Sequence, residues 1–331
     1  MTQSLEPQQP QPVQVFHGLE SFAAPAAGIA LTIGNFDGVH LGHRRLVELG
    51  RTVAQAGQPV GAMTFEPHPS EVLAPHRAPP RLTTAAEKLA LLGQAGADAV
   101  IVLRSDRALF DTPAEAFIER LAATCRPRHV VEGRSFRFGH GRAGSIDTFS
   151  AHGQRLGFAV HEAAPVVVEG AAVSSSAVRA ALLEGRGAQA GAMLGPPHRV
   201  VGTVGRGAGR GAGIGFPTAN LDDVRQLVPG HAVYAAVAQL EDGRRLRAAV
   251  NVGPQPTFEQ QAARVEAHLL DFAGDLRGRR VGLWFIARLR GQERFAGVEA
   301  LVGQLRTDVA RSREEPLAGG AARAGEMNIP L

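Results

Sequence analysis

The sequence of 331 residues contains one cysteine, one tryptophan and one tyrosine. A single cysteine, Cys125, excludes an intrachain disulfide and favours a reducing compartment. The sequence also lacks the run of about 18 apolar residues that a membrane-spanning helix needs, and its N-terminus shows no pattern of a signal peptide. We therefore expect a cytoplasmic protein with no membrane partner.

Lysine is nearly absent as well, because Lys88 is the only lysine among 35 lysines and arginines. The formal net charge is +4, but the arginines are scattered and aromatic residues suited to base stacking are few. We therefore expect no nucleic-acid partner, whereas anionic small substrates would suit this charge balance. The hydrophobic share of 44% and the charged share of 20% are typical of a soluble globular protein, and the length allows two domains.

Two histidines and three glycines stand together in GNFDGVHLGH, residues 34–43. The apolar run 29–33 before it is typical of a buried strand, and residues 44–56 have apolar residues at helical spacing. The decapeptide is thus predicted to form a strand-to-helix turn, where free N–H groups and the helix dipole favour anions. The glycines let phosphate approach the backbone, and His40 and His43 can donate to its oxygens. A glycine-rich turn with two surface histidines is the alternative.

The first half of the chain alternates between strand-like and helix-like segments. Residues 1–12 are rich in glutamine and proline, and we expect them to be disordered. The alternation predicts an α/β domain with a doubly wound parallel sheet, in which ligands bind at the carboxyl ends of the strands. The predicted strands are 29–33, 60–65, 99–103, 129–131 and 158–161, and the further predicted helices are 85–92 and 113–122.

The second half changes pattern after a Gly/Pro-rich passage at 185–197, which we interpret as a linker. Strand-like runs then follow one another with turn signals between them, which predicts an antiparallel β-barrel. A closing helix is expected at 299–310, and residues 312–331 are expected to form a flexible tail. The predicted domains are 13–184 and 198–311, and the predicted barrel strands are 198–204, 233–240, 246–252, 265–272 and 281–289.

The decapeptide resembles the signature of class I nucleotidyltransferases, specifically the FMN adenylyltransferase half of bacterial bifunctional riboflavin kinase/FAD synthetases. TFEPHP at 64–69 resembles the T-F-x-P-H-P of that family, and its prolines would fix a loop beside the active site. GRSFRFGHGRAG at 133–144 resembles the flavin-side segment of the family, with Ser135 where the family has Asp or Asn. Its phenylalanines and arginines could supply an aromatic wall and phosphate donors. The resemblance implies a flavin side made by Phe65, His68, Ser135, Phe136, Arg137 and Phe138.

A third segment, VSSSAVR at 173–179, resembles the family's I-S-S-T-x-[IV]-R. Serines at a helix start can simply cap the helix, but the capped end also faces anions and Arg179 could reach ATP phosphates. The sequence leaves two roles for Asp37: it could orient the turn, or it could assist a metal. The resemblance implies His40, His43 and Arg179 as catalytic residues, and Gly34, Asn35, Phe36, Gly42, Ser174, Ser175 and Ser176 as ATP-binding residues.

The second domain carries GFPTAN at 215–220, which matches the G-F-P-T-A-N motif of riboflavin kinases, after a glycine-rich stretch at 202–213. Glycine-rich backbone can fold over phosphates, and a threonine hydroxyl and an asparagine carbonyl are hard oxygen ligands suited to Mg²⁺. A flexible turn followed by an asparagine helix cap is the alternative. The resemblance implies a nucleotide site made by Gly215, Phe216, Pro217, Thr218 and Asn220, with Thr218 and Asn220 on Mg²⁺.

VEAHLLDF at 265–272 resembles the V-E-V-H-L-L-D-F of the same kinases. Alternate strand residues share a face, so Glu266 and His268 point together. The resemblance assigns Glu266 as the base that accepts the 5′-hydroxyl proton of riboflavin, with an ordinary exposed glutamate as the alternative. Four residues depart from the family, with open consequences: Ala212 and Gln255 stand where the family has arginine, Ala232 stands at the glycine of its G-V-Y triad, and Gln292 stands where it has an acidic residue.

The resemblance implies that the barrel phosphorylates riboflavin to FMN and that the first domain transfers adenylyl from ATP to FMN, giving FAD and pyrophosphate, with Mg²⁺. One alternative is a monofunctional FMN adenylyltransferase whose diverged barrel binds flavin without catalysis. Another is a nucleotidyltransferase for pantetheine phosphate or nicotinamide mononucleotide, which would not explain the motifs of the second domain. Small molecules are the expected partners, and self-association is left open.

Overall fold

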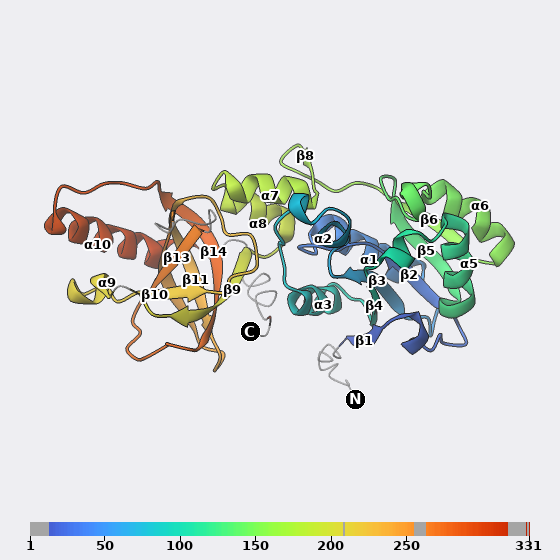
Figure 1. Cartoon of the computed structure of the whole chain (residues 1–331), viewed down its shortest axis with the longest axis horizontal. Helices are drawn as coiled ribbons and strands as arrows, with labels where there is room; N and C mark the ends of the chain where they lie inside the picture. Colours follow the sequence, from blue (N-terminus) through green and yellow to red (C-terminus); the bar gives the residue numbers. More distant parts are fainter. Residues whose placement is uncertain (1–12, 208, 255–262, 317–328, 330) are drawn as a thin grey trace, which may run out of the picture. The chain divides into compact units, whose positions relative to one another are not determined.

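The computed structural model describes residues 13–207, 209–254, 263–316, 329 and 331, and it divides into two compact units (Figure 1). The first unit takes residues 13–79 and 85–166, and the second takes 80–84 and the chain from 167 onward. The predicted disorder of residues 1–12 and the departure at Gln255 lie outside the described residues.

The first unit is built on a six-stranded sheet in the order β1-β4-β3-β2-β5-β6, in which every neighbouring pair is parallel. The predicted parallel α/β sheet is therefore confirmed. The short edge strand β1 lacks a long apolar run and was not among the predicted strands. The strands are β1 (Gln14–His17), β2 (Ile29–Ile33), β3 (Val60–Glu66), β4 (Ala99–Arg104), β5 (Pro127–Gly133) and β6 (Ala159–Ala163).

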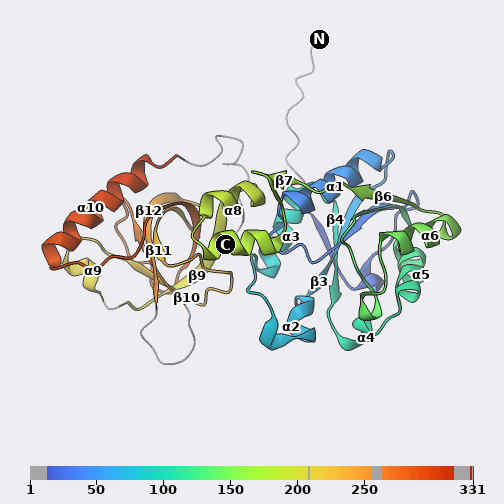
Figure 2. The ribbon, with the colours of Figure 1, turned by 90° about the horizontal axis from the view of Figure 1, so that it is seen from above.

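Helices cover both faces of this sheet (Figure 2). The buried side chains of α5 and α6 share a core with Ile29 and Leu31, whereas α1 faces β3, where a Cβ on Gly50 would meet Val60 at 3.1 Å. Cys125 at the end of α5 is buried in the core, and burial raises the pKa of its thiol to about 12. The helices are α1 (Leu41–Val53), α2 (Pro69–Leu73), α3 (Ala85–Gln94), α4 (Arg107–Phe110), α5 (Ala114–Cys125) and α6 (Ile146–Leu156).

The second unit contains a closed barrel in the order β10-β13-β12-β11-β14-β9, in which every pair is antiparallel. The helix α10 (Val298–Glu314) packs on β11 and β12, so both the predicted barrel and its closing helix are confirmed. The strands are β9 (His198–Gly205), β10 (Ala219–Asp222), β11 (Ala232–Leu240), β12 (Arg245–Pro254), β13 (Ala263–Leu269) and β14 (Arg280–Arg290), and a short helix, α9 (Arg210–Gly213), precedes β10.

The segment between the sheet and the barrel is folded. It forms the hairpin of β7 (Val167–Val168) and β8 (Ala171–Ala172), then α7 (Ser175–Leu183) and α8 (Gly187–Leu194). Residues 185–197, interpreted from the sequence as a linker, thus contain a helix whose apolar side chains pack with Leu82 and Leu227. Helix α10 continues to Glu314, past the expected start of the tail, and Gln239 donates to the carbonyl of the buried Ile329. Among the described residues, no helix has the length and apolarity to cross a membrane.

Candidate active sites

The strand order of the first unit gathers three of the sequence motifs at one edge. The decapeptide follows β2, TFEPHP spans the end of β3, and the flavin-side segment follows β5. Because β2 lies between β3 and β5 and all three are parallel, their carboxyl ends meet at the same edge of the sheet. This is the edge at which open α/β sheets bind ligands.

The turn after β2 is fixed and strained. Phe36 and Val39 have φ values of 50° and 39°, in the left-handed region, and their side chains are fully buried. Each such residue costs on the order of 1 kcal/mol or more, so the burial of both side chains must stabilise the turn against this cost. Gly34 donates to the carbonyl of Met63 at 2.9 Å, and a Cβ on Gly34 would meet the ring of Phe36 at 3.3 Å. Backbone strain of this kind is typical of functional turns.

The two histidines of the turn lie against each other at the start of α1. His40 is the N-cap of the helix, and its Nδ1 accepts the backbone N–H of His43 at 3.3 Å, so a neutral His40 carries its proton on Nε2. The two rings stack with centroids 3.6 Å apart and planes 15° apart. Burial, together with the charges of His40 and Lys88, lowers the pKa of His43 well below its usual 6.5. His43 is therefore a neutral hydrogen-bond donor at neutral pH.

On the flavin side, His68 lies at the start of α2, where its Nδ1 accepts the N–H of Ser70 at 3.2 Å, and Phe65 is half-buried. Phe136 is also half-buried and stacks on Phe138 with centroids 5.4 Å apart. Phe138 itself belongs to the core of the unit. Phe136 is thus the phenylalanine of the segment with an open face, and Phe138 supports it.

The polar residues of this segment are exposed. Arg137 donates through Nη1 to the carbonyls of Arg134 and Phe136, at 3.0 and 2.6 Å, and Ser135 is solvent-exposed. Arg134 forms ion pairs with Asp147 at 2.8 Å and Glu162 at 3.5 Å.

Sequence reasoning missed a buried carboxylic acid next to the turn. Glu132, in β5, is 1% exposed and accepts the N–H of Ile33. Burial raises its pKa well above 4.5, against the opposing effect of that hydrogen bond. The available signal was a glutamate directly after Val130 and Val131 and directly before the flavin-side segment.

The serine cluster and Arg179 belong to the second unit. Ser174 caps α7 by accepting the N–H of Ala177 at 3.1 Å, as the capping alternative expected. Ser175 and Ser176 begin the helix, and the Nε of Arg179 donates to the carbonyl of Pro80 at 2.8 Å. Their participation in the site that contains His40 and His43 stays a prediction.

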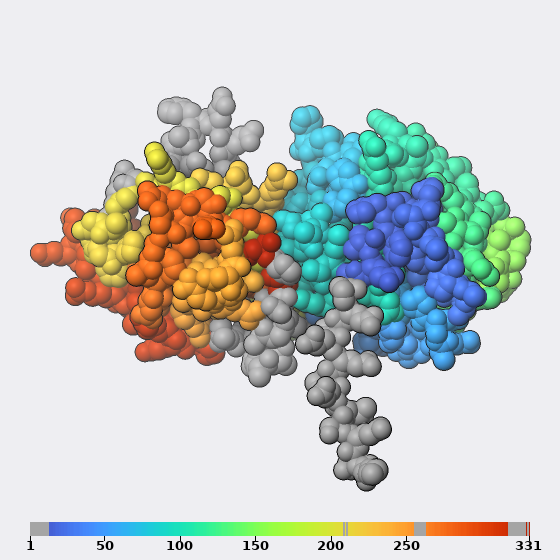
Figure 3. Space-filling view, turned by 90° about the horizontal axis from the view of Figure 1, so that it is seen from below, coloured from blue at the N-terminus to red at the C-terminus, as the bar shows by residue number. Residues whose placement is uncertain are grey.

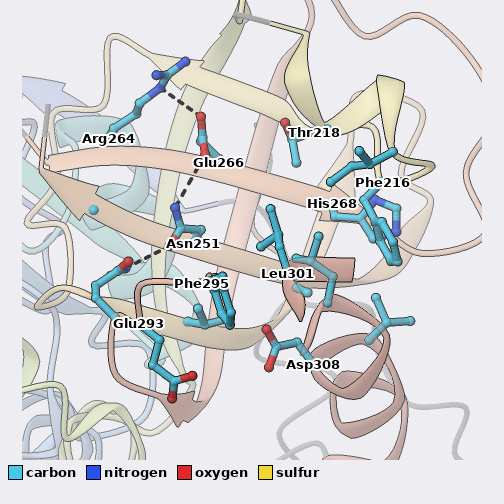
Figure 4. A pocket seen from close by; sticks show the side chains of 18 of the residues that line it. Phe216, Thr218, Asn251, Arg264, Glu266, His268, Glu293, Phe295, Leu301 and Asp308 are labelled. Carbon is cyan, nitrogen blue, oxygen red and sulfur yellow. Dashed lines mark hydrogen bonds and ion pairs between the residues drawn. The ribbon is translucent and has the colours of Figure 1, made fainter. Parts of the chain in front are cut away.

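The second unit has a cavity of about 450 Å³ between the outer face of the barrel and α10 (Figure 4). Along β13, Val265, Ala267 and Leu269 are buried in the barrel, whereas the alternate residues point outward into the cavity. Those outward residues are Arg264, Glu266 and His268. The predicted common face of Glu266 and His268 is therefore confirmed.

Strand pairing places two asparagines on either side of Glu266. Asn220 of β10 is its partner on one side, and Asn251 of β12 is its partner on the other. One carboxylate oxygen of Glu266 pairs with the Nε of Arg264 at 3.0 Å, and the other accepts from the amide of Asn251 at 3.5 Å. Arg264 also donates through Nε and Nη2 to the side-chain oxygen of Asn220, Oδ1, at 3.0 and 2.7 Å. These four side chains form one hydrogen-bonded row across three strands.

Gln292 orients this row. Its amide nitrogen donates to the carbonyl of Val252 at 2.7 Å and to Oδ1 of Asn251 at 2.8 Å. Because a backbone carbonyl can only accept, the first bond fixes the amide of Gln292, and the second then turns the NH₂ group of Asn251 toward Glu266. An ionised acid at position 292, as in the family pattern, could make neither bond. In this chain, Gln292 thus contributes to how the carboxylate of Glu266 is held.

The GFPTAN segment runs directly into β10, so Asn220 is a strand residue and the helix-cap alternative is wrong. His268 holds the segment, because its Nδ1 donates to the carbonyl of Pro217 at 2.8 Å and its ring meets Phe216 edge-on at 5.4 Å. A second cavity, of about 600 Å³, lies between the glycine-rich residues 205–207 and 209 and residues 273–277. On the face in Figure 3, the yellow residues around α9 border the orange residues that follow β13. Thr218 lines both cavities.

The wall formed by α10 is tied to the barrel by a buried ion pair. Asp308 is fully buried, and Arg290 approaches it through Nε at 3.0 and 3.1 Å and through Nη2 at 2.8 Å. The same guanidinium lies over the ring of Phe295, 5.5 Å from its centroid.

Two family models match successive parts of the chain. The FAD synthetase model matches residues 23–177, and the riboflavin kinase model matches residues 194–315. The fold and the two candidate sites thus define a two-domain transferase that uses nucleotides.

Curated relatives match nearly the whole chain. The bifunctional riboflavin kinase/FMN adenylyltransferases of Escherichia coli K12 and Pseudomonas fluorescens are both 37% identical to it, each over 91% of this chain and 97% of the relative. The chain belongs to the family of bifunctional riboflavin kinase/FMN adenylyltransferases. A crystal structure of a macrolide-efflux protein from Streptococcus pneumoniae shares the fold, with a TM-score of 0.82 and 26% identity over 91% of this chain and 99% of that one.

Proposed function

We propose that this chain makes FAD from riboflavin in two ATP-dependent steps, and that the residues described above perform them. Membership of the bifunctional family supports both activities, and both domains are present in the chain. The observation that carries the residue assignment is the row of Asn220, Glu266 and Asn251 beside a cavity of ligand size. Nothing in the comparisons favours the monofunctional alternative.

In the kinase step, Glu266 accepts the proton of the 5′-hydroxyl of riboflavin as that oxygen bonds to the γ-phosphorus of ATP and ADP leaves. Arg264 and Asn251 hold the two carboxylate oxygens, so the base is oriented before substrate arrives. Because Thr218 lines both the 450 Å³ cavity and the 600 Å³ cavity, flavin in one and nucleotide in the other would meet at this residue. Such an arrangement supplies the proximity that phosphoryl transfer requires.

The donor atoms near Thr218 suit Mg²⁺. The threonine hydroxyl and the carbonyl of Asn220 are hard oxygen ligands, and the carboxylate of Glu266 is adjacent to Asn220. The side-chain oxygen of Asn220 accepts two hydrogen bonds from Arg264. Arg264 must therefore move away from this oxygen before Asn220 can bind the ion. When bound, the ion would neutralise charge on the ATP phosphates. Within the described part of the chain, no group of three or more His, Cys, Asp or Glu side chains forms a metal site by itself.

In the adenylyl step, a phosphate oxygen of FMN bonds to the α-phosphorus of ATP as pyrophosphate leaves. His40 offers Nε2–H, His43 is a neutral donor, and the first N–H groups of α1 point toward the turn. These donors stabilise the negative charge that grows on the phosphates. Arg179 and Ser174–Ser176 would supply a second phosphate contact.

One assay tests both steps. Purified protein is incubated with Mg-ATP and either riboflavin or FMN, and the flavins are separated by chromatography. His43→Ala should abolish the formation of FAD from FMN while riboflavin is still phosphorylated, and Glu266→Gln should do the reverse. Each variant thus serves as the folding control for the other.

The outcomes separate the alternatives. A wild-type chain that makes no FAD from FMN would refute the central assignment. A chain that makes FAD from FMN but no FMN from riboflavin would be a monofunctional adenylyltransferase. Unchanged adenylyl transfer in His43→Ala would remove the histidine turn from the mechanism.

A further inference from the structure

The only lysine of the chain is buried beneath the histidine turn. Lys88 lies on α3, its residue is 0% exposed, and every other basic residue among the 35 lysines and arginines is an arginine. A buried ammonium group is stable only when it is paired and hydrogen-bonded. The groups around position 88 must therefore stabilise a cation, and their arrangement determines which kind of cation fits.

The partners of the ammonium explain that shape. Its Nζ lies 2.6 Å from Oε1 of Glu66 and donates to the carbonyls of Phe65 at 3.0 Å and Asn35 at 3.4 Å. The ammonium group carries three N–H bonds on one small nitrogen, which suits three acceptors that converge on one point. A guanidinium group is larger and planar, so its N–H groups do not converge on one point in this way. Glu66 balances the charge and is itself 21% exposed.

These acceptors come from two motifs at the carboxyl edge of the sheet. Asn35 is the second residue of the decapeptide turn, and Phe65 and Glu66 belong to TFEPHP at the end of β3. Thr64, also in β3, donates to the same carbonyl of Asn35 at 3.2 Å. The carbonyl of Asn35 is thus drawn toward the interior from two elements, α3 and β3.

The inward carbonyl sets the direction of the next N–H group. In a trans peptide the C=O and N–H bonds point in opposite directions, so the N–H of Phe36 points away from Lys88 and the interior. Phe36 then takes its strained φ of 50°, and its ring meets that of His43 edge-on at 5.1 Å. The position of Lys88 therefore influences the direction of the N–H group of Phe36 and, through the ring of Phe36, the position of His43. Its charge also contributes to the lowered pKa of His43, after burial and His40.

We propose that Lys88 is a positioning residue for adenylyl transfer: its ammonium joins the turn at Asn35 to the end of β3 and so aims the N–H of Phe36 and the ring of His43 at the phosphates of ATP. This inference rests on the proposed adenylyltransferase site. Lys88 contacts no substrate itself and acts through the backbone that it holds.

The first test compares the two activities of one chain. Lys88→Met should lower kcat/KM for ATP in FAD formation by about 100-fold, the size of effect expected from a misplacement of about 1 Å. Riboflavin phosphorylation by the barrel should be unchanged. Arg51→Met, which removes an exposed cation paired with Asp98 in the same unit, is the matched control and should leave both steps unchanged.

A double variant separates positioning from charge balance. Lys88→Met combined with Glu66→Gln contains neither member of the ion pair, so the carboxylate of Glu66 no longer lacks the Lys88 ammonium and the thermal stability lost in Lys88→Met should largely return. FAD formation should stay low, because the double variant still lacks the ammonium group that joins the turn at Asn35 to the end of β3. Recovery of wild-type FAD formation in the double variant would overturn the proposal, as would wild-type kcat/KM in Lys88→Met.

A spectroscopic measurement keeps the test decisive if Lys88→Met fails to fold. Wild-type protein grown with ¹⁵N,¹³C-labelled lysine gives the signals of Lys88 alone. Saturating Mg²⁺ with a non-hydrolysable α,β-methylene analogue of ATP should shift its ¹⁵Nζ or ¹³Cε resonance, and resonances that do not move would overturn the proposal. Wild-type protein that makes no FAD from FMN would instead refute the underlying adenylyltransferase site, so the two failures are distinguishable.

Discussion

Glu132→Gln should stabilise the first unit more strongly as the pH rises. The wild-type carboxyl is 1% exposed, and burial raises its native pKa well above 4.5. The native state therefore retains a proton that the unfolded chain has released. Stability from this group is complete below pH 4.5 and is lost as the pH rises through the native pKa. Glutamine is neutral at every pH and keeps an oxygen that can accept the N–H of Ile33.

The size of the effect follows from proton linkage. Between pH 4.5 and the raised native pKa, wild-type stability falls by up to about 1.4 kcal/mol per pH unit relative to the variant. For a unit of this size, that corresponds to roughly 3–5 °C in Tm per pH unit. His43 acts in the opposite sense, because its lowered pKa makes native stability fall as the pH drops below 6.5. It is present in both proteins, so its contribution cancels in the difference.

Calorimetry or far-UV circular dichroism at pH 5, 6 and 7 would measure the difference in Tm for the first unit. Trp284, the only tryptophan, is in β14 of the second unit, so its fluorescence transition is the internal control and should not move. A difference in Tm that is the same at all three pH values would refute the reasoning.

Three further variants test the barrel. Gln292→Met removes the hydrogen bond to Asn251 and the bond to the carbonyl of Val252 that fixes the amide of Gln292, so kcat for riboflavin phosphorylation should fall by about 10-fold or more while FAD formation from FMN is unchanged, as a coupled flavin assay would show. Gly207→Ala would place a Cβ 2.1 Å from Nδ2 of Asn220, so it should impair the kinase step alone; unchanged kinase KM and kcat would contradict the described packing. Arg290→Met leaves Asp308 buried without its cationic partner and should cost about 3–5 kcal/mol, measured by urea unfolding followed through tryptophan fluorescence. Full stability in that variant would show that the ion pair does not hold α10.

The sequence was a good guide wherever local pattern decides structure. Runs such as 29–33 coincide with their strand, and the change from alternating elements to successive strands distinguished the sheet from the barrel. Boundaries were less certain: α1 begins at Leu41, before the predicted 44, because His40 supplies the cap. Strand β10 and helix α8 were missed, since β10 has only four residues, α8 is rich in glycine and alanine, and both are stabilised by neighbours rather than by a periodic pattern of their own.

Local residue order was sufficient to predict the two activities, because phosphate-binding turns and the GFPTAN segment depend on residue types in a fixed order along the chain. Which side chains act together depends on how the chain folds. Asn220, Asn251 and Glu266 meet because three strands pair in one register, and Gln292 acquires a role only by donating to that row. Lys88, which the sequence marks only as the single lysine, becomes central because the parallel sheet brings the carbonyls of Asn35 and Phe65 and the carboxylate of Glu66 to its ammonium. Burial and strand pairing are long-range properties, and no local pattern contains them.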